Sequence, residues 1–200
     1  MSHLRFTTSS PGQQEAELVA IVRSELWLMD ALHRAKALEV EDDWIVAGAI
    51  YNTVWNRLTG RPSIEGIKDI DLFYFDPSDL SYEAEDRIIQ KGKAIFAGSP
   101  VPVEIRNQAR VHLWFGRHFG FEIEPIRSCR DSVRRFASVC YCIGVRLGGG
   151  DTIEVFAPYG LADLFSFRIR PNRFCDNRLT HEKKAARAKS FWPQLTVEPW

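Results

Sequence analysis

The feature that most constrains this chain is the segment from Ile67 to Phe75, which reads IKDIDLFYF. It is apolar and aromatic apart from acids at alternate positions, a pattern that predicts a half-buried β-strand. Because successive side chains of a strand point to opposite faces, Asp69 and Asp71 should share one face, about 6–7 Å apart. Neighbouring carboxylates repel each other unless water screens them or a cation lies between them. Such oxygen ligands suit Mg²⁺ or Mn²⁺, although solvated surface acids are the simpler alternative.

A second strand-like stretch, VPVEIRNQ at residues 101–108, carries Glu104 between apolar neighbours. An unmatched charge is costly in such a position. If this strand lies beside the first, three carboxylates converge, as two-metal phosphoryl chemistry requires. The alternative is a structural ion pair between Glu104 and either Arg106 or Arg57.

A turn of small residues lies upstream of both stretches. Residues 44–48 (WIVAG) read as a short buried strand that ends at Gly48, and helical spacing follows from Ala49. Small residues at a strand-to-helix turn allow the backbone to approach phosphate oxygens closely, and a helix N-terminus favours anions. We therefore expect Gly48 and Ala49 to contact a phosphate group.

The whole pattern mixes helices and strands without strict alternation, which favours an α+β fold: a mixed β-sheet flanked by helices. Apolar spacing predicts one helix from Gln13 to about Leu38. Other expected elements are helices at 81–96, from 128, near 160–168 and near 181–191, and a hairpin of 140–147 with 152–156. We expect residues 1–12 to be a flexible lead-in. Residues 13–200 should form a single domain, with a core at about 40–115 and a C-terminal hairpin and helices at about 128–200.

Charge argues against several classes of partner. Lys+Arg and Asp+Glu both total 26, so no global charge attracts nucleic acid or anionic lipid. No apolar run approaches the ~20 residues of a membrane span, and the opening residues lack the apolar region of an export signal. We expect a cytoplasmic protein with no membrane partner and no strong nucleic-acid signal. Basic residues do gather between Arg168 and Lys189, where a solvated face is the simpler interpretation and a tRNA-binding face the alternative.

Taken together, these motifs resemble nucleotidyltransferases with the DNA polymerase β type of fold. More closely, the chain is similar over about residues 15–200 to a bacterial group named only "nucleotidyltransferase family protein". The similar segments are GAIYNTVWNRLTG (48–60), KDIDLFYFD (68–76), VPVEIRNQARVHLW (101–114), FAPYGLADLF (156–165), RIRPN (168–172) and WPQLTVEPW (192–200). The resemblance implies the nucleotidyltransferase fold, with Asp69, Asp71 and Glu104 as metal carboxylates and Gly48 and Ala49 as the phosphate turn.

Two departures from the wider superfamily stand out. Ala49 occupies a position where the superfamily has Gly or Ser, so a hydroxyl group that could meet a phosphate is absent. The interval from Gly48 to Asp69 is also longer than in the smallest members.

Polar residues beside these motifs are candidates for nucleotide binding. Asn52 and Asn56 fall one helical turn apart, where they either face the nucleotide or serve as surface amides or caps. Lys68 adjoins the first acid. Arg106, Asn107 and Arg110 follow Glu104 and could reach a triphosphate, since Arg binds phosphate through a bidentate fork.

The sequence thus predicts a metal-dependent nucleotidyltransferase that uses Mg²⁺ or Mn²⁺. It would move NMP from an NTP to an unidentified acceptor hydroxyl or phosphate group, on a small molecule, protein or RNA, and release pyrophosphate. The alternative is a non-catalytic nucleotide- or metal-binding or regulatory protein on the same fold.

Overall fold

The fold is built on a five-stranded sheet with the strand order β3-β2-β1-β4-β5. The computed structural model describes residues 2–120 and 122–200. Its strands are β1 (Trp44–Val46), β2 (Ile70–Tyr74), β3 (Val103–Asn107), β4 (Gly144–Leu147) and β5 (Ile153–Phe156). β2 and β3 run parallel, whereas the other pairs of this sheet are antiparallel. A two-stranded parallel sheet joins β6 (Arg168–Ile169) to β7 (Thr196–Val197).

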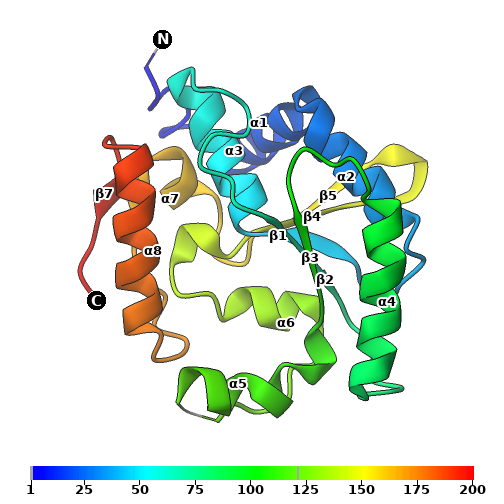
Figure 1. Ribbon diagram of the computed structural model, residues 1–200. Coiled ribbons are helices and arrows are strands. Elements are labelled where there is room, and N and C mark those ends of the chain that lie inside the picture. The colour runs from blue at the N-terminus through cyan, green and yellow to red at the C-terminus, as the bar shows by residue number, and fades with distance from the viewer. Residues whose placement is uncertain (1, 121) are drawn as a thin grey trace.

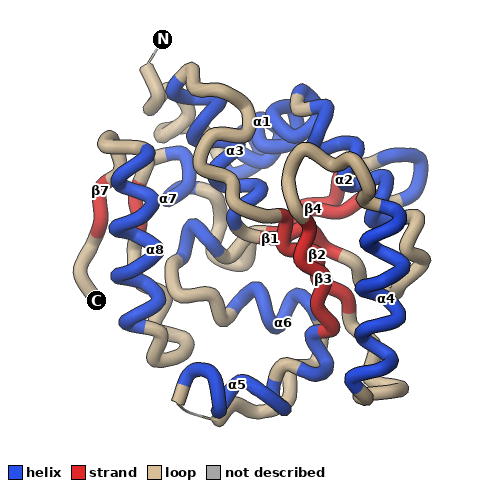
Figure 2. The backbone as a smooth tube through the Cα atoms, in the orientation of Figure 1, coloured by secondary structure: helices blue, strands red, loops and turns tan. Residues whose placement is uncertain are grey.

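Helices cover both faces of the main sheet. Those described are α1 (Pro11–Ser24), α2 (Leu26–Lys36), α3 (Gly48–Thr59), α4 (Tyr82–Ile95), α5 (His112–Phe119), α6 (Cys129–Arg134), α7 (Ala162–Phe165) and α8 (Arg178–Phe191). In Figure 1, α1, α2 and α3 lie on one side of the sheet and α5 and α6 on the other, with α4 and α8 at opposite flanks. Figure 2 shows how little of the chain is strand. The expected mixed sheet flanked by helices is confirmed.

Helix α3 is the central element of the core. Ile50, Val54 and Trp55 have no exposed surface. Trp55 Nε1 donates a hydrogen bond to the carbonyl oxygen of Leu164, 3.1 Å away, which ties α3 to α7. A helix enclosed on nearly all sides has little freedom to shift, so its N-terminus at Gly48 is held in place by packing.

The expected single helix over 13–38 is wrong, because the chain breaks at Glu25 (φ −97°, ψ 96°) between α1 and α2. The first helix begins earlier than expected, at Pro11, and Ser10 and Gln13 form a capping box at its N-terminus. At the break, the Glu25 carboxylate accepts a hydrogen bond from the Ser63 hydroxyl. This partner lies far along the chain, so the local apolar spacing could not indicate the break.

Two later boundaries also differ from expectation. The hairpin strand begins at Gly144 rather than at 140, because residues 139–141 form a 3-10 turn, η2 (Val139–Tyr141). The last helix, α8, starts at Arg178 rather than near 181. These shifts leave the order of elements unchanged.

The N-terminal residues pack against the body of the protein. The rings of Phe6 and Phe165 meet edge to face at 5.7 Å, and the Thr7 hydroxyl lies 3.3 Å from the Phe165 carbonyl oxygen. Met1 lies outside the described residues. The flexibility expected for residues 1–12 and the single-domain division stay predictions. Across the described residues, no helix combines the length and the apolar character needed to cross a membrane.

Candidate active site

Three neighbouring strands align one residue each in a row across the sheet. Val46 on β1 is the register partner of Asp71 on β2, and Asp71 is the partner of Glu104 on β3. Adjacent strands lie about 4.8 Å apart, so the two carboxylates are side by side on one face. The two acidic segments therefore meet as expected. Asp69 lies immediately before β2, which begins at Ile70, rather than inside the strand.

Asp71 points away from the core face of β2. Ile70, Leu72 and Tyr74 are buried on one face of the strand, and Asp71 and Phe73 are half-buried on the other. Among the described residues, no hydrogen bond or ion pair ends on the Asp71 carboxylate. Burial raises the pKa of Asp71 to about 6; the nearby charges of Asp69 and Glu104 add to this, and Lys184 opposes it.

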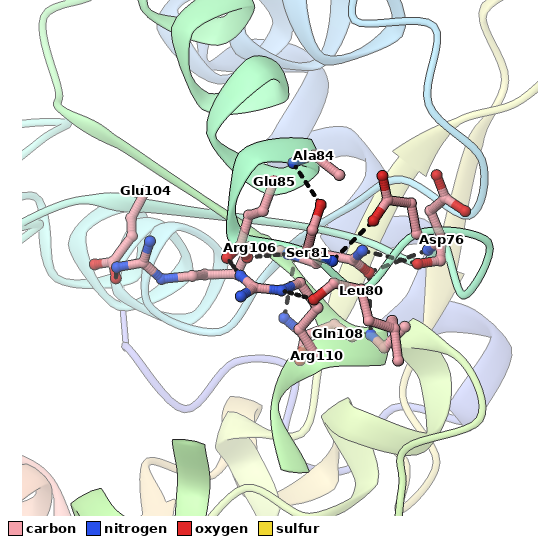
Figure 3. A network of polar contacts seen from close by, with 12 residues as sticks. Asp76, Leu80, Ser81, Ala84, Glu85, Glu104, Arg106, Gln108 and Arg110 are labelled. Atoms are coloured by element: carbon pink, nitrogen blue, oxygen red, sulfur yellow. Dashed lines mark hydrogen bonds and ion pairs between the residues drawn. The ribbon is translucent and has the colours of Figure 1, made fainter. Parts of the chain in front are cut away.

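The other two carboxylates have cationic partners from the chain itself. Lys68 Nζ lies 3.1 Å from Asp69 Oδ2, and this contact raises the pKa of Lys68. Arg106 Nη2 lies 2.6 Å from Glu104 Oε1 on a partly exposed surface, where Figure 3 shows the two side chains together. The ion pair with Arg106 that the sequence allowed is thus present. Exposed pairs of this kind stabilise a fold by less than about 1 kcal/mol, so a charged ligand can compete for them.

The turn from β1 to α3 carries backbone strain at Ala47. This residue has φ 53° and ψ −111°, a conformation that side chains disfavour. No described side chain caps the N-terminus of α3 with a hydrogen bond. The sequence indicated Gly48 and Ala49 as the turn but gave no sign that Ala47 takes the strained conformation. Strain of this kind persists only where the surroundings enforce it, and it is common at functional sites.

The structure distinguishes Asn52 from Asn56. Asn56 is fully engaged: its Nδ2 donates to the carbonyl oxygens of Ser63 and Glu65, and its Oδ1 accepts from Trp192 Nε1. Asn52 is similarly buried, yet its Oδ1 has no hydrogen-bond partner among the residues that the structure describes. Asn52 therefore remains a candidate for ligand binding, and Asn56 holds the loop before β2 against α3.

Asn107 and Arg110 belong to a structural network; Figure 3 shows its part around Arg110, Glu85 and Asp76. The Asn107 amide bonds the backbone N–H and carbonyl oxygen of Asp76 at 3.1 and 2.8 Å, and its Oδ1 also accepts from Ala109 N. Arg110 is ion-paired to buried Glu85 and donates to the Leu80 carbonyl oxygen at 2.9 Å. Because these groups are satisfied within the chain, we leave both residues out of the proposed nucleotide site.

Residues 33–197 match the model of a nucleotidyltransferase family. The chain belongs to this family. A solved structure, described as an NMR structure that reveals a CCA-adding enzyme head domain, is similar with a TM-score of 0.75 at 24% sequence identity. The likeness covers 97% of this chain and 100% of the other, and shows that the two share a fold. No curated protein matches the chain.

The carboxylates of this nucleotidyltransferase fit a divalent cation in their donor chemistry. Asp69, Asp71 and Glu104 offer only oxygen ligands, and Asp71 has no hydrogen-bond or ion-pair partner in the part of the chain that the structure describes. Within residues 2–120 and 122–200, however, no three His, Cys, Asp or Glu side chains are close enough to share one metal ion. A cation held by all three carboxylates would have to replace Lys68 as the partner of Asp69 and Arg106 as the partner of Glu104.

Helix α8 brings two cations to the site that the sequence did not single out. Lys184 lowers the pKa of Asp71, and Arg187 acts in the same direction on Tyr51. Arg187 Nη2 also donates to the carbonyl oxygen of Gly66 at 2.9 Å, on the loop that leads to Asp69. The basic run at 168–189 contained both residues, but nothing in the pattern distinguished them from a solvated face.

Two hollows of the described surface lie elsewhere. Cavities of about 550 and 460 Å³ flank Arg57, at the opposite end of α3 from Gly48. The nine residue steps from Gly48 to Arg57 correspond to about 14 Å of helix. None of the three carboxylates is among the residues that line these hollows.

Proposed function

We propose that this nucleotidyltransferase moves NMP from an NTP to an acceptor hydroxyl or phosphate and releases pyrophosphate. The register that places Asp71 opposite Glu104, beside the turn at Gly48, is the observation that carries the proposal. In the reaction, the acceptor oxygen bonds to the α-phosphorus. The bond from the α-phosphorus to the oxygen that bridges it to the β-phosphate breaks, and pyrophosphate leaves with the electron pair. A hydroxyl acceptor gives its proton to Glu104 or to water.

Asp69, Asp71 and Glu104 would hold Mg²⁺ or Mn²⁺, which supplies positive charge to the triphosphate and to the attacking oxygen. Gly48 and Ala49 offer their backbone N–H groups to a phosphate at the N-terminus of α3. Asn52 adds its side-chain amide. Without ligand, Lys68 neutralises Asp69 and Arg106 neutralises Glu104. With NTP bound, both cations pair with the phosphates instead.

The test uses thermal shift and pyrophosphate release. Wild type is melted with each NTP, with and without Mg²⁺ or Mn²⁺, and compared with Asp71→Asn and with the exposed control Asp176→Asn. A ligand at ~100 times its Kd adds about 2.7 kcal/mol to the free energy of unfolding. We expect a metal-dependent shift that Asp71→Asn loses and Asp176→Asn keeps. Pyrophosphate release that persists in the double variant Asp69→Asn/Asp71→Asn would contradict the proposal.

A second candidate is a non-catalytic nucleotide-binding or regulatory protein. The ion pairs Lys68–Asp69 and Arg106–Glu104 favour it, because they occupy two of the three carboxylates in the absence of ligand. Tight NTP binding without pyrophosphate release, against any acceptor pool, would support this candidate. For either function we expect the cytoplasm as the compartment.

A further inference from the structure

Two stacked tyrosines lie behind the Gly48 turn. Tyr51 on α3 and Tyr141 on η2 stack with ring centroids 4.5 Å apart and planes inclined by 27°. Tyr51 also packs against Trp55 at 5.1 Å. Both tyrosines are more than nine-tenths buried. Their rings are therefore held by the core, and only their hydroxyl groups can differ in role.

The two hydroxyls have different surroundings. The Tyr141 hydroxyl is fully buried and has no hydrogen-bond partner in the described part of the chain. The Tyr51 hydroxyl reaches the turn: a Cβ built on Gly48 would lie 3.8 Å from it, and 3.8 Å from Asn52 Nδ2. Within the described residues the Tyr51 hydroxyl has no hydrogen-bond partner either. The Tyr51 hydroxyl and Asn52 Nδ2 thus converge on the position that a Cβ of residue 48 would take, and because Gly48 has no Cβ, an atom of a ligand can occupy that position.

The charged groups around the Tyr51 hydroxyl suit an anionic ligand that binds together with a cation. Burial raises the pKa of Tyr51, and the charges of Asp71 and Asp69 add to that effect, so the phenol stays protonated at neutral pH and can donate. Arg187 also acts on both tyrosines from α8. The groups that meet here are donors: the phenol, the Asn52 amide and the first N–H groups of α3. An array of donors beside a helix N-terminus recognises phosphate oxygens.

We propose that the Tyr51 hydroxyl binds a phosphate oxygen of the nucleoside triphosphate, together with Asn52 and the Gly48 turn. The inference rests on the proposed function and adds to it a residue that contacts the triphosphate. Tyr51 supplies a hydroxyl group at a turn where Ala49 has none. Tyr141 supports the ring of Tyr51 and does not contact the ligand.

The chain offers a matched pair of variants for the test. Tyr51→Phe and Tyr141→Phe each remove one hydroxyl and keep both rings in the stack. Affinities for the NTP series and for inorganic pyrophosphate, each with Mg²⁺, are measured by calorimetry, and each unliganded variant is melted to confirm that it folds. A hydrogen bond to a charged group is worth about a tenfold or larger change in Kd. We expect Tyr51→Phe to weaken both ligands at least tenfold and Tyr141→Phe to leave both unchanged.

The outcomes separate this inference from the proposed function. If wild type binds NTP and Asp71→Asn does not, but Tyr51→Phe binds like wild type, the Tyr51 contact is wrong and the proposed function stands. Equal weakening in both Phe variants would mean that the stack, not the hydroxyl, matters, and would also overturn the inference. If wild type binds neither NTP nor pyrophosphate, both proposals fail.

Discussion

Asp71 lies opposite Glu104 across the parallel pair β2–β3, and no cation among residues 2–120 and 122–200 is bonded to Asp71. The arrangement is unfavourable for the unliganded protein, because burial and two neighbouring carboxylates all disfavour the charged form of Asp71. The electrostatic cost at Asp71 and the backbone strain at nearby Ala47 both lower the stability of the unliganded protein. Their presence together therefore indicates a ligand-binding role rather than a stabilising one.

The first prediction concerns pH and stability. The pKa of Asp71 is about 6 in the folded state and ordinary, about 4, in the unfolded state. The folded state therefore binds this proton more tightly, and the free energy of unfolding falls as the pH rises from about 4 to 6. The free energy of unfolding of Asp71→Asn should exceed that of wild type by about 1–2 kcal/mol at pH 7 and differ little from it at pH 4. Urea titrations at both pH values test this.

The control for that prediction is Asp176→Asn, which removes the same charge from an exposed position. Its unfolding free energy should stay close to that of wild type at both pH values. A stability of Asp71→Asn that equals wild type at pH 7 would show that the carboxylate is well solvated.

The second prediction concerns Lys184 on α8. Its charge acts on Asp71 in the unliganded protein, so it should also act on the phosphates of a bound NTP. Lys184→Ala should weaken NTP binding about fivefold, the effect of one partly screened charge. Lys183→Ala, at an exposed neighbouring position, is the control and should bind normally. Equal effects from both variants would indicate only a diffuse field from the basic helix.

The alternating pattern of 67–75 predicted β2 well, because a strand with one buried face has apolar residues at every second position. The helix expected at 81–96 also forms, as α4, and the Ser81 hydroxyl caps it by accepting a hydrogen bond from Ala84 N at 3.2 Å. That β3 lies beside β2, and so that Glu104 faces Asp71, was a conditional expectation that the register confirmed.

What could not be predicted depended on distant partners. Asn52 and Asn56 look alike in sequence, and only the loop at 63–65 and Trp192 distinguish them. The position of α8 depends on contacts with distant residues: Nδ1 of buried His181 lies 2.8 Å from the Ser138 hydroxyl. Because most of the helix is polar, its sequence does not indicate which face packs against the protein. The strain at Ala47 follows from the geometry of the strand-to-helix turn, to which an alanine gives no local clue.

The third prediction compares two Arg–Glu pairs. Glu85 is buried and the Arg110 side chain is only 11% exposed, and Glu85 also accepts from Asn107 N at 2.9 Å. Arg110→Ala leaves a buried carboxylate without its cation, so the free energy of unfolding should fall by about 3–5 kcal/mol. Arg106→Ala breaks the half-exposed pair with Glu104 and should cost under about 1 kcal/mol. Chemical denaturation of both variants measures the difference; equal losses would contradict the burial argument.

The fourth prediction concerns Gly66, at the loop that leads to Asp69. Its φ is +72°, and a Cβ there would lie 2.8 Å from Trp192 Cη2, a fully buried ring. Gly66→Ala should therefore combine the cost of a left-handed alanine, about 1–2 kcal/mol, with overpacking of about 1–3 kcal/mol. Gly60→Ala is the matched control, since its φ is +70° and nothing lies within 4 Å of its Cβ.

Gly60→Ala should show the backbone cost alone. The difference in unfolding free energy between the two variants therefore measures the overpacking of residue 66 against Trp192, at the end of α8. The Gly66 carbonyl oxygen also accepts a hydrogen bond from Arg187, so a displaced loop should move Asp69 and weaken metal-dependent NTP binding in Gly66→Ala only. Melting curves and NTP titrations of both variants test this. If Gly66→Ala loses no more stability than Gly60→Ala and binds NTP normally, then close packing between the loop and α8 does not position the carboxylates.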